Sequence, residues 1–315
     1  MNAISMNIKI ASIAGVMLLA SGVAKAQVLD DIESSVTQGN QYNEALQVFP
    51  DNVEDDDADT SVDGEAGVYV LKKNEIFSVR AIVGTGYSDN PSRTSDSDIE
   101  SSAAAQMALS IGADTRINGA VDAGTNLVIS GTEYETDGAP DSRNVVANAY
   151  VGKSLLNGTV FGSVSGTYGQ AMNGTFGEAT GFYGLSASVT TVRPLTDKVV
   201  VRPRLSVSRQ WSEVTELDNT SVTTEASASW AIAPKWQATG SLAFTHRIYD
   251  DFYEDVTFIE RKDDSWRAGV SVSRQINDKV AVSANLTYVD QSSDFFVSDY
   301  TSYDGGLSVR IVKRF

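Results

Sequence analysis

The residues able to do acid–base or nucleophilic chemistry are few, and they centre on one histidine. The chain of 315 residues has a single His, at position 246, and no Cys, which excludes cysteine catalysis, disulfides and zinc–thiolate sites. Alternation places His246 on an apolar face between Phe244 and Ile248. A hydrolytic site would need a nucleophile beside the ring and an acid to orient it. The facing run offers Thr224 rather than Ser, and no acid is expected on that face, so we predict that the chain is not an enzyme.

Carboxylates crowd the segment from Tyr249 to Asp264, which reads YDDFYEDVTFIERKDD. Carboxylate oxygens suit Ca²⁺ or Mg²⁺, so a divalent-ion site is one interpretation. The segment lacks the order of acids and glycine found in a known calcium loop, and a solvated exterior loop is the interpretation we prefer. We expect no metal and no cofactor. The sequence also has no Gly-rich phosphate loop and no basic stripe for nucleic acid.

Strands must position these residues, because the chain from Ile76 onward alternates between apolar and polar side chains. Between Val280 and Tyr288, for example, every second residue is apolar. The runs are rich in Val, Thr, Ser, Ala and Tyr and are separated by turn residues. They predict twelve antiparallel strands at about 76–87, 100–112, 117–133, 143–154, 159–170, 180–193, 199–212, 219–232, 236–249, 265–276, 280–290 and 302–315.

The connections between these runs fall into two alternating sets. The short set is expected around Ala113–Arg116, Leu155–Gly158, Pro194–Lys198, Ala233–Lys235 and Asn277–Lys279. The longer, acidic set is expected near 88–99, 134–142, 171–179, 213–218, 250–264 and 291–301. A soluble β-sandwich would also have short, regular strands, but it would not sort its connections in this way. Short turns on one side and long loops on the other are typical of transmembrane β-barrels, so we predict such a barrel over residues 72–315.

The polar faces of these strands would form the inside of the barrel. By alternation, the basic residues predicted to line the pore are Arg80, Arg202, Arg204, Arg247, Arg267 and Arg310, and the acidic ones are mainly Asp122 and Glu225. A basic interior within a low-dielectric wall would concentrate anions. The alternative is that these arginines only satisfy packing and hydrogen bonds inside the barrel. The sequence leaves both interpretations open.

Aromatic residues on the apolar faces are expected to form two girdles, because their rings prefer the membrane–water interfaces. The girdle at the loop side would contain Tyr168, Tyr183, Trp211, Trp266 and Tyr288. The girdle at the turn side would contain Phe77, Trp230, Trp236 and Phe315.

The first 71 residues are expected to lie outside the barrel. Lys9, an apolar run and the small residues around Ala24-Lys25-Ala26 predict a secretory signal over residues 1–26. Residues 27–71 hold twelve Asp or Glu and no Lys or Arg, so self-repulsion should keep this periplasmic tail extended and largely disordered. An inert tail is one interpretation. The other is a plug, in which the acidic residues 51–65 transiently enter the basic interior.

The last strand has an apolar side that runs from Gly305 to the terminal Phe315. It resembles the closing strand of bacterial outer-membrane β-barrels, in which the terminal aromatic residue is part of the insertion signal. Lys313 departs from that pattern, because the family usually has an aromatic or aliphatic residue there. The resemblance implies the bacterial outer membrane as location, with barrel-assembly machinery, membrane lipid and lipopolysaccharide as partners.

The segment GTGYSDNPSRT, Gly84–Thr94, resembles the aromatic-x-Asp-Asn turn of the putative beta-barrel porin family associated with exopolysaccharide loci. That resemblance implies a channel for small or extended anionic solutes, with saccharides among the candidates. An autotransporter translocator is the main relative to exclude, because its barrel also has twelve strands and ends in Phe. The stretch ahead of this barrel is too short for a passenger domain. The competing class is a non-conducting structural or assembly barrel whose loops bind a partner.

Deleting Phe315 should sharply reduce membrane insertion, because the terminal aromatic residue belongs to the expected insertion signal. The measurement is outer-membrane fractionation, combined with gel mobility before and after boiling. Recovery of the intact protein as a soluble periplasmic monomer would contradict the barrel prediction.

Overall fold

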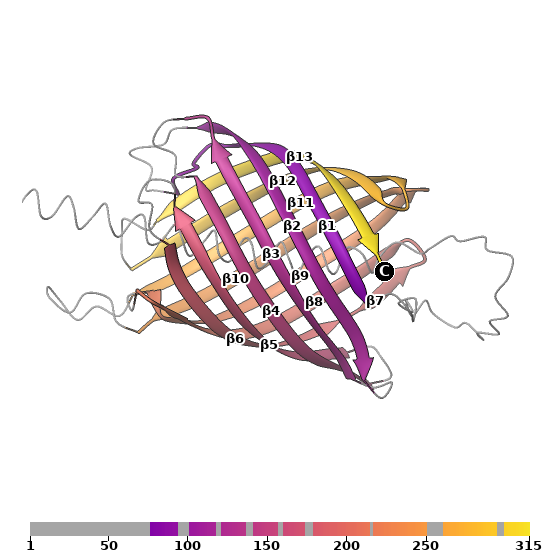
Figure 1. Ribbon diagram of the computed structural model, residues 1–315, viewed down its shortest axis with the longest axis horizontal. Coiled ribbons are helices and arrows are strands. Elements are labelled where there is room, and N and C mark those ends of the chain that lie inside the picture. The colour runs from indigo at the N-terminus through magenta and orange to yellow at the C-terminus, as the bar shows by residue number, and fades with distance from the viewer. Residues whose placement is uncertain are drawn as a thin grey trace, which may run out of the picture.

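The computed structural model contains one antiparallel sheet that closes on itself as a barrel (Figure 1). It describes residues 76–93, 101–117, 121–136, 141–156, 160–173, 179–214, 217–250, 261–294 and 299–315. The predicted signal and acidic tail, residues 1–26 and 27–71, lie outside these ranges. Within them, no helix is both long enough and apolar enough to cross a membrane.

The sheet has thirteen strands, of which β7 is a short extension of the wall. They are β1 (Phe77–Ser88), β2 (Ser102–Ile117), β3 (Val121–Tyr134), β4 (Ser142–Leu155), β5 (Val160–Asn173), β6 (Ala179–Thr191), β7 (Arg193–Thr196), β8 (Val199–Ser212), β9 (Asn219–Ala233), β10 (Trp236–Tyr249), β11 (Lys262–Asn277), β12 (Val280–Ser293) and β13 (Tyr300–Arg314). β6 and β7 both pair with β8, so they act as one interrupted strand of a twelve-stranded wall.

The barrel closes where the first strand pairs with the last. The antiparallel ladder of β1 and β13 runs from Ser78 opposite Arg314 to Ser88 opposite Asp304. At the turn end, the Phe77 amide donates to the Phe315 carbonyl at 3.3 Å, and the Phe315 amide donates to the Phe77 carbonyl at 2.9 Å. The terminal residue is therefore hydrogen-bonded into the seam.

Two of the predicted short connections are wrong in detail. Ala113–Arg116 belongs to β2, whose ladder with β3 continues as far as Ile117 opposite Val121. The polar residues that suggested a turn are strand residues, and one of them, Asp114, accepts a hydrogen bond inside the barrel. Within Pro194–Lys198, residues up to Thr196 pair with β8 as β7. The remaining strands, and the alternation of short turns with longer loops, confirm the prediction.

The outer face of the barrel is apolar. Many outward-facing strand residues are large, apolar and exposed, such as Leu127 in β3, which is 38% exposed, and Val270 in β11, which is 59% exposed. The outward-facing aromatic rings also contact one another across strands near the loop end: Tyr183 stacks on Trp211 at 5.1 Å, and two tilted pairs form, Phe244 with Trp266 at 4.8 Å and Tyr288 with Tyr303 at 4.8 Å. A monomer in water would not expose so continuous an apolar belt, but lipid would cover it.

Acidic residues at the points where strands end and loops begin have a structural role. Carboxylates accept hydrogen bonds from backbone amides where strands end: Asp89 from Tyr303, Asp141 from Tyr134, Asp218 from Ser212 and Asp299 from Ser293. An unpaired amide at a strand end is costly when it is shielded from water. Part of the acidic character of the loops is thus explained without a metal ion.

The two faces predict opposite responses to a new charge. Arg at Leu127 or Val270 should reduce the free energy of unfolding by about 2–4 kcal/mol, because both side chains face lipid near mid-strand. Arg at Ser227 or Ser271, on the inner face, should cost much less. Urea unfolding of refolded protein in lipid vesicles measures the difference, and equal costs for the two pairs would contradict the assigned faces.

Candidate functional site

The candidate site is the inner wall, where the structure places all six predicted arginines. Each lies at an inward strand position, and Arg80, Arg202 and Arg247 are buried. Alternation of polar and apolar residues predicted the inward face of these arginines, because the β1–β13, β8–β9 and β10–β11 ladders have no bulge at their positions. Their role as pore lining stays a prediction.

Basic residues gather at the turn end of the seam. Arg310 lies opposite Ile82 in the ladder, two positions from Arg80, and Arg314 lies opposite Ser78. The expectation that Arg80 and Arg310 come from neighbouring strands is confirmed. Arg314 was missed as a lining residue, although the same alternation in the last strand places it on the inner face.

A second basic pair lies on β8. The Arg202 guanidinium donates to Ser229 Oγ at 3.3 Å. Arg204 lies directly opposite the predicted acidic residue Glu225 on β9. Arg204 therefore has a carboxylate directly across the ladder, and Arg202 has a hydroxyl partner on the same neighbouring strand.

The acidic side of the wall is larger than the sequence prediction. Asp122 lies inward on β3, opposite Gly152, but Asp114 lies inward as well and accepts a 2.9 Å hydrogen bond from the Tyr150 hydroxyl. The Tyr150 ring crosses Gly124, where a Cβ atom would come within 2.5 Å of it. Gly124 is therefore required for this contact, which fixes Asp114 against the wall.

A buried ionic cluster lies at the loop end, on β10 and at the start of β11. Arg261 Nε donates to Asp263 Oδ1 at 2.9 Å, and both side chains are only 1% exposed. Arg261 also lies over the Tyr249 ring, 4.4 Å from its centroid. Arg247 Nη1 donates to the Tyr249 hydroxyl at 3.3 Å, and Ser293 Oγ donates to Asp263 at 2.5 Å. Tyr249 thus sits between two guanidinium groups.

Arg261 and Asp263 were missed because the strand was expected to begin at residue 265. It begins at Lys262, and the inward parity of Arg267 extended backwards would have found both residues. Residues 251–260, the centre of the acidic segment that was interpreted as a solvated exterior loop or a divalent-ion site, lie outside the described ranges.

Arginines outnumber carboxylates at the described inner wall. The eight arginines are Arg80, Arg202, Arg204, Arg247, Arg261, Arg267, Arg310 and Arg314. The five carboxylates are Asp114, Asp122, Glu225, Asp263 and Asp304. The wall carries an excess of positive charge in a protein whose formal net charge is −17.

His246 has an acidic partner, contrary to the sequence prediction. Its Nδ1 atom is 2.6 Å from Asp264 Oδ1 across the β10–β11 ladder, on the outer face. The pair was missed because β11 was expected to begin at residue 265, which placed Asp264 in a loop, whereas β11 begins at Lys262. Across β9, His246 faces Val222, and Thr224 lies opposite Phe244. No hydroxyl nucleophile lies directly opposite the ring, and the absence of enzymatic activity stays a prediction.

A second ionic contact on the outer rim joins Arg209 of β8 to Asp250. Both guanidinium ends of Arg209 donate to this carboxylate, one of them at 2.7 Å. These hydrogen bonds hold the pKa of Asp250 below its usual value. Because both side chains are substantially exposed, the pair adds little to stability.

A closed antiparallel barrel with a polar inner wall, an apolar outer belt and aromatic rings near its rims has the architecture of a transmembrane β-barrel. The protein is therefore a β-barrel of the bacterial outer membrane. Strand order, ladder closure and the two faces all support this class.

No known family model and no curated protein sequence matches the chain. Among solved structures, an outer membrane channel from Pseudomonas putida F1 is similar at 11% identity and a TM-score of 0.52, over 80% of this chain and 100% of that one. The beta domain of the Bordetella autotransporter BrkA has 12% identity and a TM-score of 0.45, over 75% and 99% of the two chains. The translocator domain of the autotransporter NalP from Neisseria meningitidis has 12% identity and a TM-score of 0.43, over 89% and 97%. At these identities the likeness concerns the fold.

Breaking the buried ion pair should be far more costly than breaking the exposed one. Asp263→Asn leaves Arg261 charged and buried, which should lower the free energy of unfolding by about 3–5 kcal/mol. Asp250→Asn, the matched control at the rim, should cost about 0–1 kcal/mol. Urea unfolding in detergent micelles measures both, and similar small costs would show that water reaches Arg261.

Proposed function

We propose that the protein is an outer-membrane channel that favours anionic solutes, small or extended, with saccharides among them. The observation that carries the proposal is the excess of arginine on the inner wall of a closed barrel. Fixed positive charge inside a low-dielectric wall raises the local concentration of anions.

Two comparisons support this proposal. The similar barrel from Pseudomonas putida F1 is described as an outer membrane channel. The resemblance of Gly84–Thr94 to the putative beta-barrel porin family of exopolysaccharide loci points to the same class. In this chain, Asp89 and Asn90 of that motif bind the backbone of Tyr303 and Thr301, so the motif fastens the first loop to the last strand.

One observation favours the second candidate, a non-conducting structural barrel whose loops bind a partner. Inner-wall side chains such as Arg80, Arg202 and Arg247 are only 8%, 8% and 3% exposed. The loop-end parts of β4, β5 and β6 also hold a buried apolar cluster of Val146, Ala171 and Phe182. Close packing at these positions narrows the interior.

Reversal potentials across planar bilayers under a potassium chloride gradient should distinguish the two candidates. The wild-type protein should conduct and prefer chloride. Replacing Arg202 and Arg204 together by Gln should lower that preference several-fold, because it removes positive charge from the inner wall. Arg274→Gln is the matched control, since Arg274 faces outward over Trp236. An absence of conductance would support the structural barrel, and unselective conductance would refute the anionic preference.

The same recordings would test the acidic tail. If residues 51–65 enter the basic interior, a variant without residues 27–64 should conduct more, most visibly at low salt, where attraction between the charges is least screened. Unchanged conductance would identify the tail as an inert linker.

A further inference from the structure

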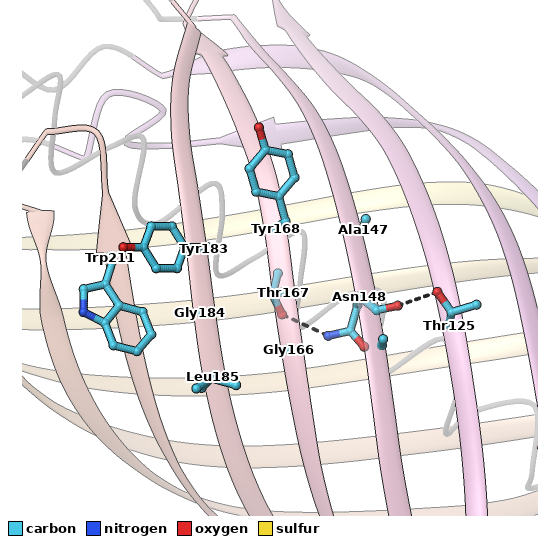
Figure 2. Close-up of a pocket in the computed structure, with 11 residues that line it drawn as sticks. Thr125, Ala147, Asn148, Gly166, Thr167, Tyr168, Tyr183, Gly184, Leu185 and Trp211 are labelled. Carbon is cyan, nitrogen blue, oxygen red and sulfur yellow. Dashed lines mark hydrogen bonds between the residues drawn. The ribbon is translucent and has the colours of Figure 1, made fainter.

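A groove with a volume of about 540 Å³ lies on the outer face of the barrel, between mid-strand positions of β3 and β4 and the loop-end parts of β6 and β8 (Figure 2). Its outward-facing lining consists of Thr125, Ala147, Ala149, Gly166, Tyr168, Tyr183, Leu185 and Trp211. The Thr125 hydroxyl donates to the Asn148 backbone carbonyl at 2.9 Å, so this polar group of the lining is already hydrogen-bonded. The other polar atoms of the outward-facing lining are the Tyr168 and Tyr183 hydroxyls and the Trp211 indole N–H. The groove is therefore mainly apolar, and it opens toward the membrane.

The shape of the groove follows from the sizes of its side chains. Ala147 and Ala149 of β4 and Gly166 of β5 form a low floor, because little projects from the sheet there. Tyr183 and Trp211 stack at 5.1 Å with an interplanar angle of 15°, which makes a stiff wall on the β6–β8 side. Figure 2 shows these two rings together, with Leu185 further along β6. An acyl chain of a lipid is apolar and narrow enough to lie along such a groove.

Arg143 lies on the same strand and the same face as the floor, toward the loop end. It is exposed, and it lies four positions from Ala147, about 13 Å along a strand. Within the described ranges, no carboxylate lies within ion-pair distance of its guanidinium group, whereas Arg209 at the rim is bound to Asp250. The cation above the groove is thus available to an external anion.

We propose that the groove and Arg143 together bind one phosphate-bearing lipid of the outer leaflet. Its acyl chain lies over Ala147, Ala149 and Gly166, and its phosphate group meets Arg143. Strands in such barrels tilt by about 35–45°, so 13 Å along β4 corresponds to about 10 Å of depth. That depth falls within one leaflet of a hydrocarbon core about 30 Å thick. The loop end faces the cell exterior in barrels of this class, which assigns the lipid to the outer leaflet.

A second copy of the chain would not satisfy the same features. The apolar belt of a second copy would fill the groove, but apolar side chains supply no anion for Arg143. A lipid satisfies both ends of the site. The proposal does not depend on conductance through the barrel, because every group that it uses faces outward.

Trp211 lines the groove and provides a direct readout. Replacing Trp230, Trp236 and Trp266 by Phe leaves Trp211 as the only tryptophan of the four. This single-Trp protein would be refolded in phosphatidylcholine vesicles that contain brominated phosphatidylglycerol, whose acyl bromines quench tryptophan fluorescence on contact. Brominated phosphatidylcholine provides the zwitterionic comparison. Trp211 should prefer the anionic lipid by about fivefold, as expected for one basic side chain near the surface.

Two substitutions separate the headgroup contact from the groove. Arg143→Gln should bring the preference for the anionic lipid close to one, and Arg143→Lys should retain most of it. Gly166→Leu should reduce quenching by both brominated lipids, because the leucine side chain would fill the groove. A Cβ atom at Gly166 would come no closer than 4.0 Å to its neighbours, so the barrel can accept the side chain. Gly240→Leu is the matched control, since Gly240 also faces outward and its nearest neighbour is also at 4.0 Å.

Three results would overturn the proposal. The first is an equal lipid preference in the wild-type, Arg143→Gln and Gly166→Leu proteins. The second is an equal preference at Trp266, tested in a protein that keeps only that tryptophan, because it would indicate general attraction to the barrel. The third is efficient disulfide dimerisation of Ala149→Cys in vesicles, which would assign the groove to a second copy, since the native chain has no cysteine. Inorganic phosphate should not displace the lipid, because a free anion cannot occupy the groove.

Discussion

The pairing of β1 with β13 is the constraint on which the rest of the structure depends. A sheet with free edges exposes unpaired amides and carbonyls, which lipid cannot satisfy. The seam is held at the turn end by the two backbone hydrogen bonds between Phe77 and Phe315, and at the loop end by Asp89 and Asn90 binding Tyr303 and Thr301. Lys313, the departure from the usual closing strand, is accommodated because its Nζ atom lies 4.5 Å from the centroid of the Phe315 ring. The apolar part of the Lys313 side chain contacts lipid, while its charged amino group stays near the membrane–water interface.

Closure of the barrel also divides the side chains into two sets with different surroundings, lipid outside and other side chains or water inside. Outward-facing residues contact lipid, which offers polar groups no hydrogen-bonding partner, so most of these residues are apolar. Their aromatic rings cluster near the membrane–water interfaces. Inward residues must satisfy one another or water. They do so through short serine and threonine contacts between strands, such as Ser165 with Ser186 at 2.7 Å and Ser283 with Ser308 at 2.8 Å. Two pairs of charged residues on the outer face, Arg209 with Asp250 and His246 with Asp264, lie near the loops.

Alternation in the sequence predicted the barrel, the number of full strands and the face of every proposed lining arginine, because a ladder without bulges preserves parity. It failed where polar residues lie inside strands. Asp114 was placed in a turn, and Asp263 and Asp264 were placed in a loop, although all three are strand residues with partners across the wall. Strand ends in such a barrel are set by the pairing partner, and composition does not reveal them. The groove could not be predicted either, since it arises from small residues on β4 and β5 meeting large ones on β6 and β8.

The packing and the charge of the inner wall differ between its loop end and its turn end, and this difference limits how a solute could pass. At the loop end, Val146, Ala171 and Phe182 pack on β4 to β6, while Arg247, Tyr249, Arg261 and Asp263 form an ionic cluster on β10 and β11. The stack of Tyr249 with Arg261 and the buried ion pair hold that second cluster rigid, so it would narrow the mouth without adding much free charge. The basic residues near the turn end, Arg80 and Arg310 at the seam and Arg202 on β8, lie on well-separated strands of the wall. In the proposed channel the mouth would therefore select mainly by size, and the preference for anions would arise deeper, on the side of the short turns.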